Sequence, residues 1–254
     1  MDRLPNLFIP GFQKCATCTI FESLIQHHRV SGAKRWRDLN RLTFPKEVHY
    51  FDKHYDRGLD FLASLYEGAE EDYLIDGSPN YIADPGAFER ILVAVPEARF
   101  IVSMRNPVDR TISAWNHRSQ LEPHEKWSVP VPGGTLMDNI IADVAAKSSS
   151  PPGGGLLGLG CYASHIRKAV KLSSHDRFHF LFLEDLNVSF AGEIRKIFDF
   201  LELDPIALPN LHVHRRQHTA DDQTTEAVEF LTDYYKDEDD KLSELLGVEL
   251  PWRV

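Results

Sequence analysis

Residues 7–25 read LFIPGFQKCATCTIFESLI, and this stretch decides the fold. An apolar run at Leu7–Pro10 is followed by a loop that contains Gly11, and then by apolar residues at helical spacing from Ile20 to Ile25. The pattern predicts a buried strand, a loop and a helix in direct succession. The backbone N–H groups at the start of such a helix, together with its positive end, can hold a phosphate group.

The loop GFQKCATCT, residues 11–19, offers a phosphate several partners in addition to the helix end. Lys14 adds a positive charge, and Thr17 and Thr19 add hydroxyl donors. The Gly-Lys-Ser/Thr ending of a Walker loop is missing, which counts against an ordinary nucleotide triphosphatase. A simpler alternative needs no ligand, because Thr19 and Glu22 have the spacing of a capping box. The candidate phosphate site comprises Lys14, Cys15, Ala16, Thr17, Cys18 and Thr19.

Further apolar runs predict more strands, and amphipathic stretches predict helices between them. The strands are expected at residues 73–75, 100–104 and 178–183, and the helices after Arg105 and at 162–172, 191–201 and 225–246. Runs that are apolar almost throughout suit strands covered on both faces. The expected fold class is therefore α/β, with a central, mostly parallel sheet flanked by helices.

Length and composition favour one compact domain. The chain has 254 residues, of which 43% are hydrophobic, enough for one sizeable core. We expect a single domain over residues 1–254 with a flexible loop at 147–160, where proline pairs and glycine runs continue neither regular structure.

Charge and cysteine content narrow the partners and the compartment. A net charge of −10 argues against nucleic acid as a partner. The three cysteines show no disulfide framework, and no apolar stretch has the length of a signal-peptide core or a membrane span. We expect a cytoplasmic protein that does not bind membranes. The sequence does not indicate its oligomeric state.

A second motif, RFIVSMRNPVDRTISAWNH, occupies residues 99–117. It predicts Arg105 at a strand end and Ser113 about two turns into the next helix, for which Asn106 is the expected N-cap and Pro107 the first residue. A long arginine side chain and this serine could approach one anion beside the helix start. Taken singly, each is more simply a surface arginine or a buried serine.

Three motifs in this order resemble those of sulfotransferases that use 3′-phosphoadenosine 5′-phosphosulfate (PAPS). The loop at 11–19 resembles their 5′-phosphosulfate loop, and the motif at 99–117 resembles their 3′-phosphate segment. KEVHYFD, residues 46–52, resembles the Lys-Glu-x-His-Phe-Phe-Asp segment of the heparan sulfate sulfotransferase-like branch. A looser likeness continues in DGSPNY, GCYASHIRKAV and HRRQH, at residues 76–81, 160–170 and 214–218. The resemblance implies a P-loop-like three-layer fold.

The resemblance also implies a reaction, in which a sulfuryl group moves from PAPS to a hydroxyl or amine and leaves 3′,5′-bisphosphoadenosine (PAP), without a metal. Lys14 would stabilise the charge on the leaving phosphate, and Glu47 would be the general base, with His49 as its neighbour or as the alternative base. A glutamate, with a reference pKa of about 4.3, is a useful base only if burial or neighbours raise its pKa. Without the resemblance, Glu47 reads as a surface partner of Lys46 and His49 as a core histidine.

The same resemblance proposes residues for the rest of the donor. Arg105 and Ser113 would bind the 3′-phosphate, while Tyr162, Arg215 and Arg216 are candidates for contacts with the nucleotide, since aromatic stacking and arginine contacts suit it.

The acceptor is less defined by the sequence. Some relatives carry a lysine where this chain has Gly77 and an arginine where it has Cys18, and the lost charge favours a small neutral or cationic acceptor over a sulfated polysaccharide. A saccharide sulfotransferase, a small-molecule kinase with a similar loop, and a nucleotide-binding scaffold without catalysis are the alternatives.

Overall fold

The computed structural model describes residues 3–36, 46–119, 134–146, 155–208 and 222–253. The chain divides into two compact units: a sheet unit, residues 1–104 with 168–214, and a helical unit, residues 105–167 with 215–254. The single domain expected over residues 1–254 stays a prediction.

One five-stranded sheet forms the centre of the sheet unit. Its strands are β1 (Leu7–Gly11), β2 (Val30–Gly32), β3 (Tyr73–Asp76), β4 (Arg99–Met104) and β5 (Phe178–Phe182), in the spatial order β2-β3-β1-β4-β5. Every neighbouring pair is parallel, which confirms the expected α/β class. β2 is the strand that sequence reasoning missed, because the three residues VSG are too short to carry a period-2 pattern.

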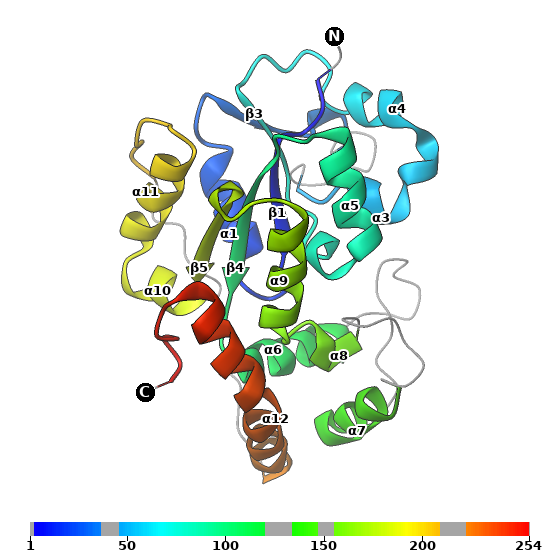
Figure 1. The fold of residues 1–254 in the computed structure, drawn as a ribbon, viewed down its shortest axis with the longest axis vertical. Helices are drawn as coiled ribbons and strands as arrows, with labels where there is room; N and C mark the ends of the chain where they lie inside the picture. Colours follow the sequence, from blue (N-terminus) through cyan, green and yellow to red (C-terminus); the bar gives the residue numbers. More distant parts are fainter. Residues whose placement is uncertain (1–2, 37–45, 120–133, 147–154, 209–221, 254) are drawn as a thin grey trace. The chain divides into compact units, whose positions relative to one another are not determined.

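Side chains that alternate along β1 enter two different cores, as the pleat of a strand requires. Leu7 and Ile9 pack with apolar side chains of α1 (Thr17–Leu24) and α11 (Phe190–Phe200). Phe8 stacks on Phe100 at 5.9 Å between ring centroids and meets the edge of Tyr81 at 6.4 Å. The layer on that side includes α3 (Tyr50–Lys53) and α5 (Pro85–Ala94), so helices cover both faces of the sheet (Figure 1). The three-layer expectation is confirmed.

Shorter elements complete the sheet unit. They are α4 (Leu59–Ser64), α10 (Leu183–Val188) and three turns of 3₁₀ helix at Tyr55–Arg57, Tyr81–Ala83 and His175–Arg177. The helix expected at 191–201 is α11, one residue earlier.

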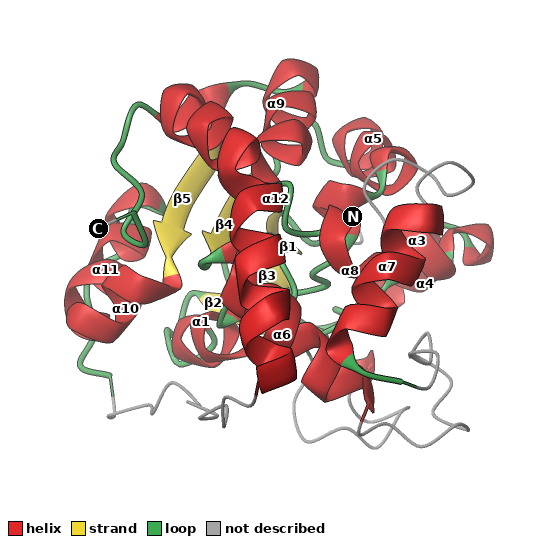
Figure 2. Cartoon of the chain, turned by 90° about the horizontal axis from the view of Figure 1, so that it is seen from below, coloured by secondary structure: helices red, strands yellow, loops and turns green. Residues whose placement is uncertain are grey.

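The helical unit is built around α6 (Pro107–Ser119) and α12 (Asp222–Leu246), with α7 (Leu136–Ala146) and α8 (Gly155–Gly158). α12 packs along α6 and α7 (Figure 2), where Ile112, Ile140 and Leu231 share one core. The expected start of α6 is confirmed, because Asn106 Oδ1 accepts the Val108 N–H at 2.9 Å. The helix expected at 162–172 is α9 (Tyr162–Leu172), which continues into the sheet unit, and α12 begins three residues before the expected 225.

A flexible loop was expected over residues 147–160, and this expectation is wrong for residues 155–158. Residues 155–158 form α8, and the N–H of Leu157 donates to Asp143 at 2.8 Å. Local composition suggested no helix here because Gly155 and Gly158 are poor helix formers, and packing against α7 and α6 overrides that preference. Residues 147–154 lie outside the described part of the chain.

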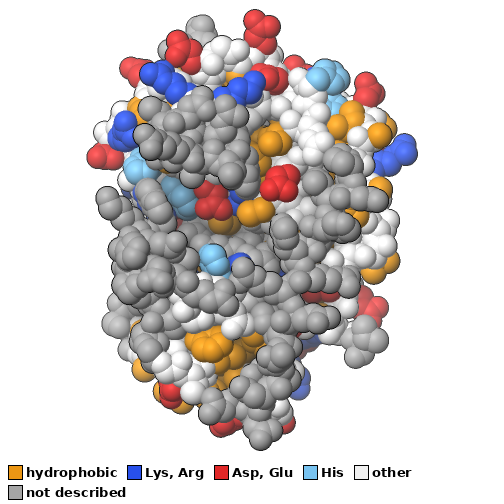
Figure 3. Space-filling model, turned by 180° about the vertical axis from the view of Figure 1, so that it is seen from behind, with side chains coloured by type: hydrophobic (Ala, Val, Ile, Leu, Met, Phe, Trp, Pro, Cys, Tyr) orange, Lys and Arg blue, Asp and Glu red, His pale blue; other side chains and the backbone are white. Residues whose placement is uncertain are grey.

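Charge is mixed on the surface. On the face drawn in Figure 3, acidic and basic side chains of the described residues are interspersed. Within the described ranges, no helix is both long enough and apolar enough to cross a bilayer.

Candidate active site

The loop between β1 and α1 has a strained backbone. Lys14 and Ala16 both adopt left-handed φ values, 68° and 61°, which residues other than glycine rarely take and which cluster at ligand sites. Ala16 is the N-cap residue of α1 and has no side-chain oxygen to accept from the first-turn N–H groups. The capping-box alternative is wrong, because α1 begins at Thr17 and places Thr19 inside the helix.

Two hydrogen bonds attach this loop to the end of β4. The Phe12 N–H donates to the Ser103 carbonyl at 3.0 Å, and the Ser103 hydroxyl donates to the Cys15 carbonyl. β1 lies between β3 and β4, where the strand order reverses, and ligands of parallel sheets bind at the carboxyl ends of strands at such a point. Sequence reasoning missed Ser103, which looks like one polar residue in an apolar strand.

The loop residues differ in what they can offer a ligand. Lys14 is half-buried and Cys18 is exposed. Thr17 and Thr19 are each 5% exposed, while Cys15 is fully buried and its carbonyl accepts from the Ser103 hydroxyl. All three cysteines are free thiols.

A second group of candidate site residues begins at Lys46, also in the sheet unit. The Lys46 ammonium, only 4% exposed as a residue, donates to Glu47 Oε1 at 2.5 Å and to the Gly77 carbonyl at 3.0 Å. Glu47 Oε2 lies 3.4 Å from His49 Nε2, and His49 Nδ1 lies 2.9 Å from Asp52 Oδ2. The ion pair of Lys46 with Glu47 is therefore not a surface pair. Together with His49 and Asp52, these side chains form one network in which basic and acidic groups alternate.

This network determines both relevant pKa values. Burial would raise the pKa of Glu47, but the hydrogen bond from His49 and the charge of Lys46 outweigh it and lower that pKa to about 2. Burial would lower the pKa of His49, but hydrogen bonds to Asp52 and Glu47 raise it to about 9. The network thus lowers the Glu47 pKa, whereas an efficient glutamate base would have a raised pKa. At neutral pH, Glu47 is a carboxylate and His49 an imidazolium.

Gly77 brings the two groups together. Its N–H donates to the Lys46 carbonyl at 2.8 Å. A Cβ at Gly77 would lie 2.9 Å from Lys46 Cγ and 3.1 Å from the Phe21 ring of α1. The stem of Lys46 and the helix that follows the phosphate loop therefore approach each other across a position that admits no side chain.

In the helical unit, Arg105 and Tyr162 are linked directly. Tyr162 Oη donates to the Arg105 carbonyl at 2.9 Å, and Arg105 Nη2 lies 3.3 Å from Asp109 Oδ2. Tyr162 is only 1% exposed as a residue, and its contact with a nucleotide stays a prediction. Ser113, half-buried, occupies the seventh position of α6, as expected. Arg215 and Arg216 lie outside the described residues.

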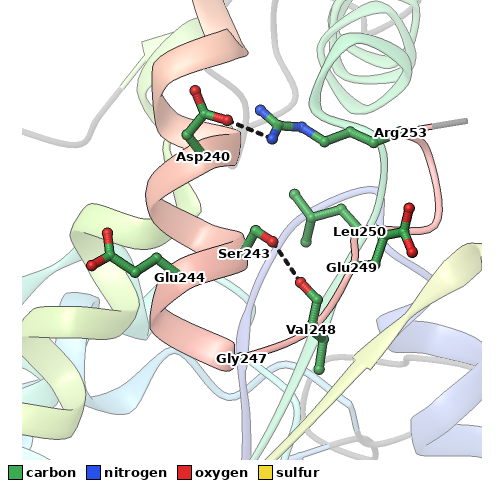
Figure 4. A pocket seen from close by; sticks show the side chains of 8 residues that line it. All are labelled: Asp240, Ser243, Glu244, Gly247, Val248, Glu249, Leu250 and Arg253. Carbon is green, nitrogen blue, oxygen red and sulfur yellow. Dashed lines mark hydrogen bonds and ion pairs between the residues drawn. The ribbon is translucent and has the colours of Figure 1, made fainter.

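One hollow of the described chain lies away from these residues. It lies between the end of α12 and the C-terminal segment, has a volume of about 580 Å³, and is crossed by the 2.6 Å ion pair of Arg253 with Asp240 (Figure 4). Its lining carries the carboxylates of Glu244 and Glu249 and none of the expected site residues, so it is ill-suited to a phosphate. Among the described residues, no cluster of three or more His, Cys, Asp or Glu side chains could hold a metal ion.

The comparisons with known proteins agree on one family. The model of the sulfotransferase domain matches residues 4–232. Human heparan sulfate glucosamine 3-O-sulfotransferase 6 is 27% identical over 202 residues, which cover 79% of this chain and 53% of that protein. Human bifunctional heparan sulfate N-deacetylase/N-sulfotransferase 3 is 30% identical over 130 residues, 48% of this chain and 14% of that protein. The chain thus spans about half the length, or less, of these curated relatives.

Solved structures share the fold. A crystal structure of a sulfotransferase from Alicyclobacillus acidocaldarius aligns with a TM-score of 0.72 at 20% identity, over 98% of both chains. The sulfotransferase domain from the curacin biosynthetic pathway aligns with a TM-score of 0.53 at 14% identity, over 99% of this chain and 100% of that one. Because the family model covers most of the residues and the fold agrees, this chain belongs to the sulfotransferase domain family.

Proposed function

We propose that the chain transfers a sulfuryl group from PAPS to a hydroxyl or amine of an acceptor and releases PAP. The observation that carries this proposal is the approach of two groups within one unit: the strained loop with Lys14 leads into α1, and α1 meets Lys46 and its partner Glu47 across Gly77. Sulfuryl transfer to a protonated acceptor needs a fixed cation, here beside a helix start, to stabilise the developing negative charge. It also needs a base, here a carboxylate, to take the acceptor proton.

The donor is bound at its two phosphate ends. Lys14 and the amides of residues 15–19 hold the 5′-phosphosulfate and stabilise the charge that builds on the bridging oxygen. Arg105 and Ser113 bind the 3′-phosphate. This is supported by chain continuity, because Arg105 directly follows β4, whose end is bonded to the phosphate loop. Arg215 and Arg216 are proposed to contact the nucleotide, and Tyr162 is proposed to hold the Arg105 backbone.

Glu47 is the proposed base. As the acceptor oxygen or nitrogen attacks sulfur in line, the bond from sulfur to the leaving phosphate breaks, and PAP leaves with that electron pair. Attack makes the acceptor proton acidic, so even a carboxylate with a lowered pKa can take it late in the reaction. His49 is the weaker candidate because its raised pKa keeps it protonated at neutral pH. The transferred group carries less charge than a phosphoryl group, so the proposed reaction invokes no metal.

The proposed acceptor is a small neutral or cationic molecule, such as a secondary metabolite. The charges of Lys46 and His49 are already balanced by Glu47 and Asp52, which leaves little attraction for a polyanion. The alternative is a saccharide, favoured by the names of the curated relatives. The free thiols fit the proposed cytoplasmic location.

Ligand-dependent melting tests the donor. PAP should raise the melting temperature, and ATP should not, since a tight ligand stabilises the folded state by mass action. Stabilisation by ATP, with phosphate transfer to an acceptor, would establish a kinase instead. Transfer of ³⁵S from labelled PAPS to a panel of phenols, alcohols, amines and desulfated heparin oligosaccharides then separates the acceptor classes. Binding of PAP without transfer to any of them would favour a scaffold.

The exposed thiol of Cys18 reports directly on the loop. N-ethylmaleimide should modify Cys18 readily, and PAP should protect it, because the ligand would cover the first turn of α1. Half-buried Cys161 serves as the internal control, which PAP should leave unchanged. Equal labelling of Cys18 with and without PAP, at a PAP concentration that raises the melting temperature, would place the donor elsewhere.

A further inference from the structure

Asp76, at the end of β3, is a fully buried carboxylate to which the proposed transfer assigns no step. Its Oδ1 accepts from the Ser78 hydroxyl at 2.6 Å, the Ser78 N–H at 3.0 Å and the Val48 N–H at 3.4 Å. Its Oδ2 accepts from the Tyr81 hydroxyl at 2.8 Å. A carboxylate so deep in the protein is costly unless hydrogen bonds satisfy it, and these donors do so.

Two of those donors, the Ser78 and Tyr81 hydroxyls, also bind the backbone of the segment that follows Glu47. The Ser78 hydroxyl also accepts the His49 N–H at 2.9 Å, and the Tyr81 hydroxyl also accepts the Phe51 N–H at 3.4 Å. A hydroxyl has one proton and two lone pairs. Because each proton is directed to Asp76, a lone pair is left to face a backbone N–H. Asp76 thus orients two hydroxyls, and these bind the backbone on both sides of Tyr50.

The backbone held in this way is strained. His49 has a left-handed φ of 53°, an uncommon conformation for a residue with a side chain, and it persists only where surrounding contacts enforce it. Residue 46 is held by the same turn, through the paired hydrogen bonds of Lys46 with Gly77. Contacts with residues 76–81 therefore anchor the chain on both sides of Glu47.

We propose that Asp76 is a positioning residue for sulfuryl transfer, which acts through Ser78 and Tyr81 to fix the left-handed turn at His49 and so hold the Glu47 and His49 side chains together. This inference rests on the proposed role of Glu47, but its structural part stands apart from that role. Its first test therefore does not depend on activity.

The test uses variants that remove one hydroxyl each, Ser78→Ala and Tyr81→Phe, with Ser78→Thr as the variant that keeps a hydroxyl. Matched controls are Ser31→Ala and Tyr66→Phe, two other buried hydroxyls of this unit, which donate to the carbonyls of Gly32 and Ile75. Two hydroxyl variants keep the test open if one of them fails to fold.

NMR titration of the His49 imidazole is the first readout. Its raised pKa reports its pairing with Glu47 and Asp52, against the opposing charge of Lys53. We expect Ser78→Ala and Tyr81→Phe to move this pKa towards 6.5, Ser78→Thr to restore it, and both controls to leave it in place. An unchanged pKa in both hydroxyl variants would overturn the proposal, whatever reaction the protein catalyses.

Kinetics give the second readout. We expect kcat to fall about 10- to 100-fold in the hydroxyl variants, since a displacement of about 1 Å costs about that much, while the Kd for PAP stays within about twofold. In a Glu47→Gln background, Ser78→Ala should cost no further kcat, because its effect passes through Glu47. A further loss of the same size in that background would overturn the positioning role. Absence of transfer by the wild-type protein would reject the proposed function and leave the imidazole titration to decide on Asp76.

Discussion

The Glu47 carboxylate lies between two cations, and its role is tested by removing the charge without changing the shape. We expect Glu47→Gln to lower kcat about 10²- to 10⁴-fold, the usual contribution of a positioned base, while PAP binds within about twofold of wild-type affinity. Turnover from PAPS and calorimetry with PAP measure the two quantities. Glu67→Gln, which alters an exposed pair with Arg35, is the control. Near-normal turnover in Glu47→Gln would remove the base assignment.

Substitutions of Lys14 and Arg105 are expected to impair different properties of the enzyme, the chemical step and the affinity for PAP. Lys14→Ala should lower the rate of the chemical step about 10²- to 10³-fold, because its charge is needed most where negative charge develops. Arg105→Ala should mainly raise the Kd for PAP, since the 3′-phosphate takes no part in the chemistry. Single-turnover kinetics and PAP titrations separate these effects. Small and equal losses in both variants would contradict the proposed donor site.

At the scale of single residues, the sequence predicted which residues form the candidate site, but it did not predict the pKa directions of Glu47 and His49. Lys46, Glu47 and His49 stand out in the sequence because their spacing matches a known segment. The pKa directions of Glu47 and His49 depend on hydrogen bonds made in the folded chain, in particular those allowed by the left-handed turn at His49, which lies 3.4 Å from Glu47. Burial alone would raise the pKa of the Glu47 carboxylate, and the neighbouring His49 and Lys46 lower it instead.

Among the helices, α12 adds a buried hydroxyl to its apolar packing against α6 and α7. Tyr235 Oη donates to the Leu157 carbonyl at 2.9 Å and lies 2.9 Å from Thr111 Oγ1. We expect Tyr235→Phe to lower the free energy of unfolding by about 0.5–1.5 kcal/mol, the usual net contribution of one hydrogen bond, because the Leu157 carbonyl loses one donor and keeps the Gly160 N–H. Urea unfolding measures the change. Tyr55→Phe, with a ring 41% exposed, should change stability by less than about 0.5 kcal/mol, and equal effects would contradict the argument.

Elements with strong patterns were predictable, and short ones were not. β1, β4 and α6 carry apolar runs or capping signals of several residues, and all three form where expected. β2 and α8 are three and four residues long and exist because neighbours complete their hydrogen bonds or cover their apolar side chains. Local preference is too weak over so few residues to decide their structure.

For the whole molecule, the His49 network predicts how stability depends on pH. The folded pKa of His49 is raised to about 9 from 6.5, so its stabilisation is fully present below pH 6.5 and is lost as the pH rises through 9. The folded pKa of Glu47 is lowered from 4.5 to about 2, so its stabilisation is present above pH 4.5 and is lost as the pH falls towards 2. These two groups favour the folded state most between pH 4.5 and 6.5.

Urea unfolding at pH 6.5 and pH 9 tests this dependence. The wild-type protein should lose stability over this interval, on the order of 2–3 kcal/mol from this group, and His49→Gln should lose less. The growing negative charge of the chain destabilises both proteins alike, so their difference isolates His49. The same loss in both would show that His49 is not stabilised as an imidazolium.

The amino-acid sequence alone determined where β1, β4 and α6 form, the loop between β1 and α1, and the identities of the charged residues, because each is encoded within a few neighbouring positions. Tertiary structure decided how Lys46 meets Gly77 and how the Ser78 hydroxyl binds the His49 N–H. Those contacts join residues about thirty positions apart in the chain, and only the parallel pairing of β3 beside β1 and the packing of α1 bring them together.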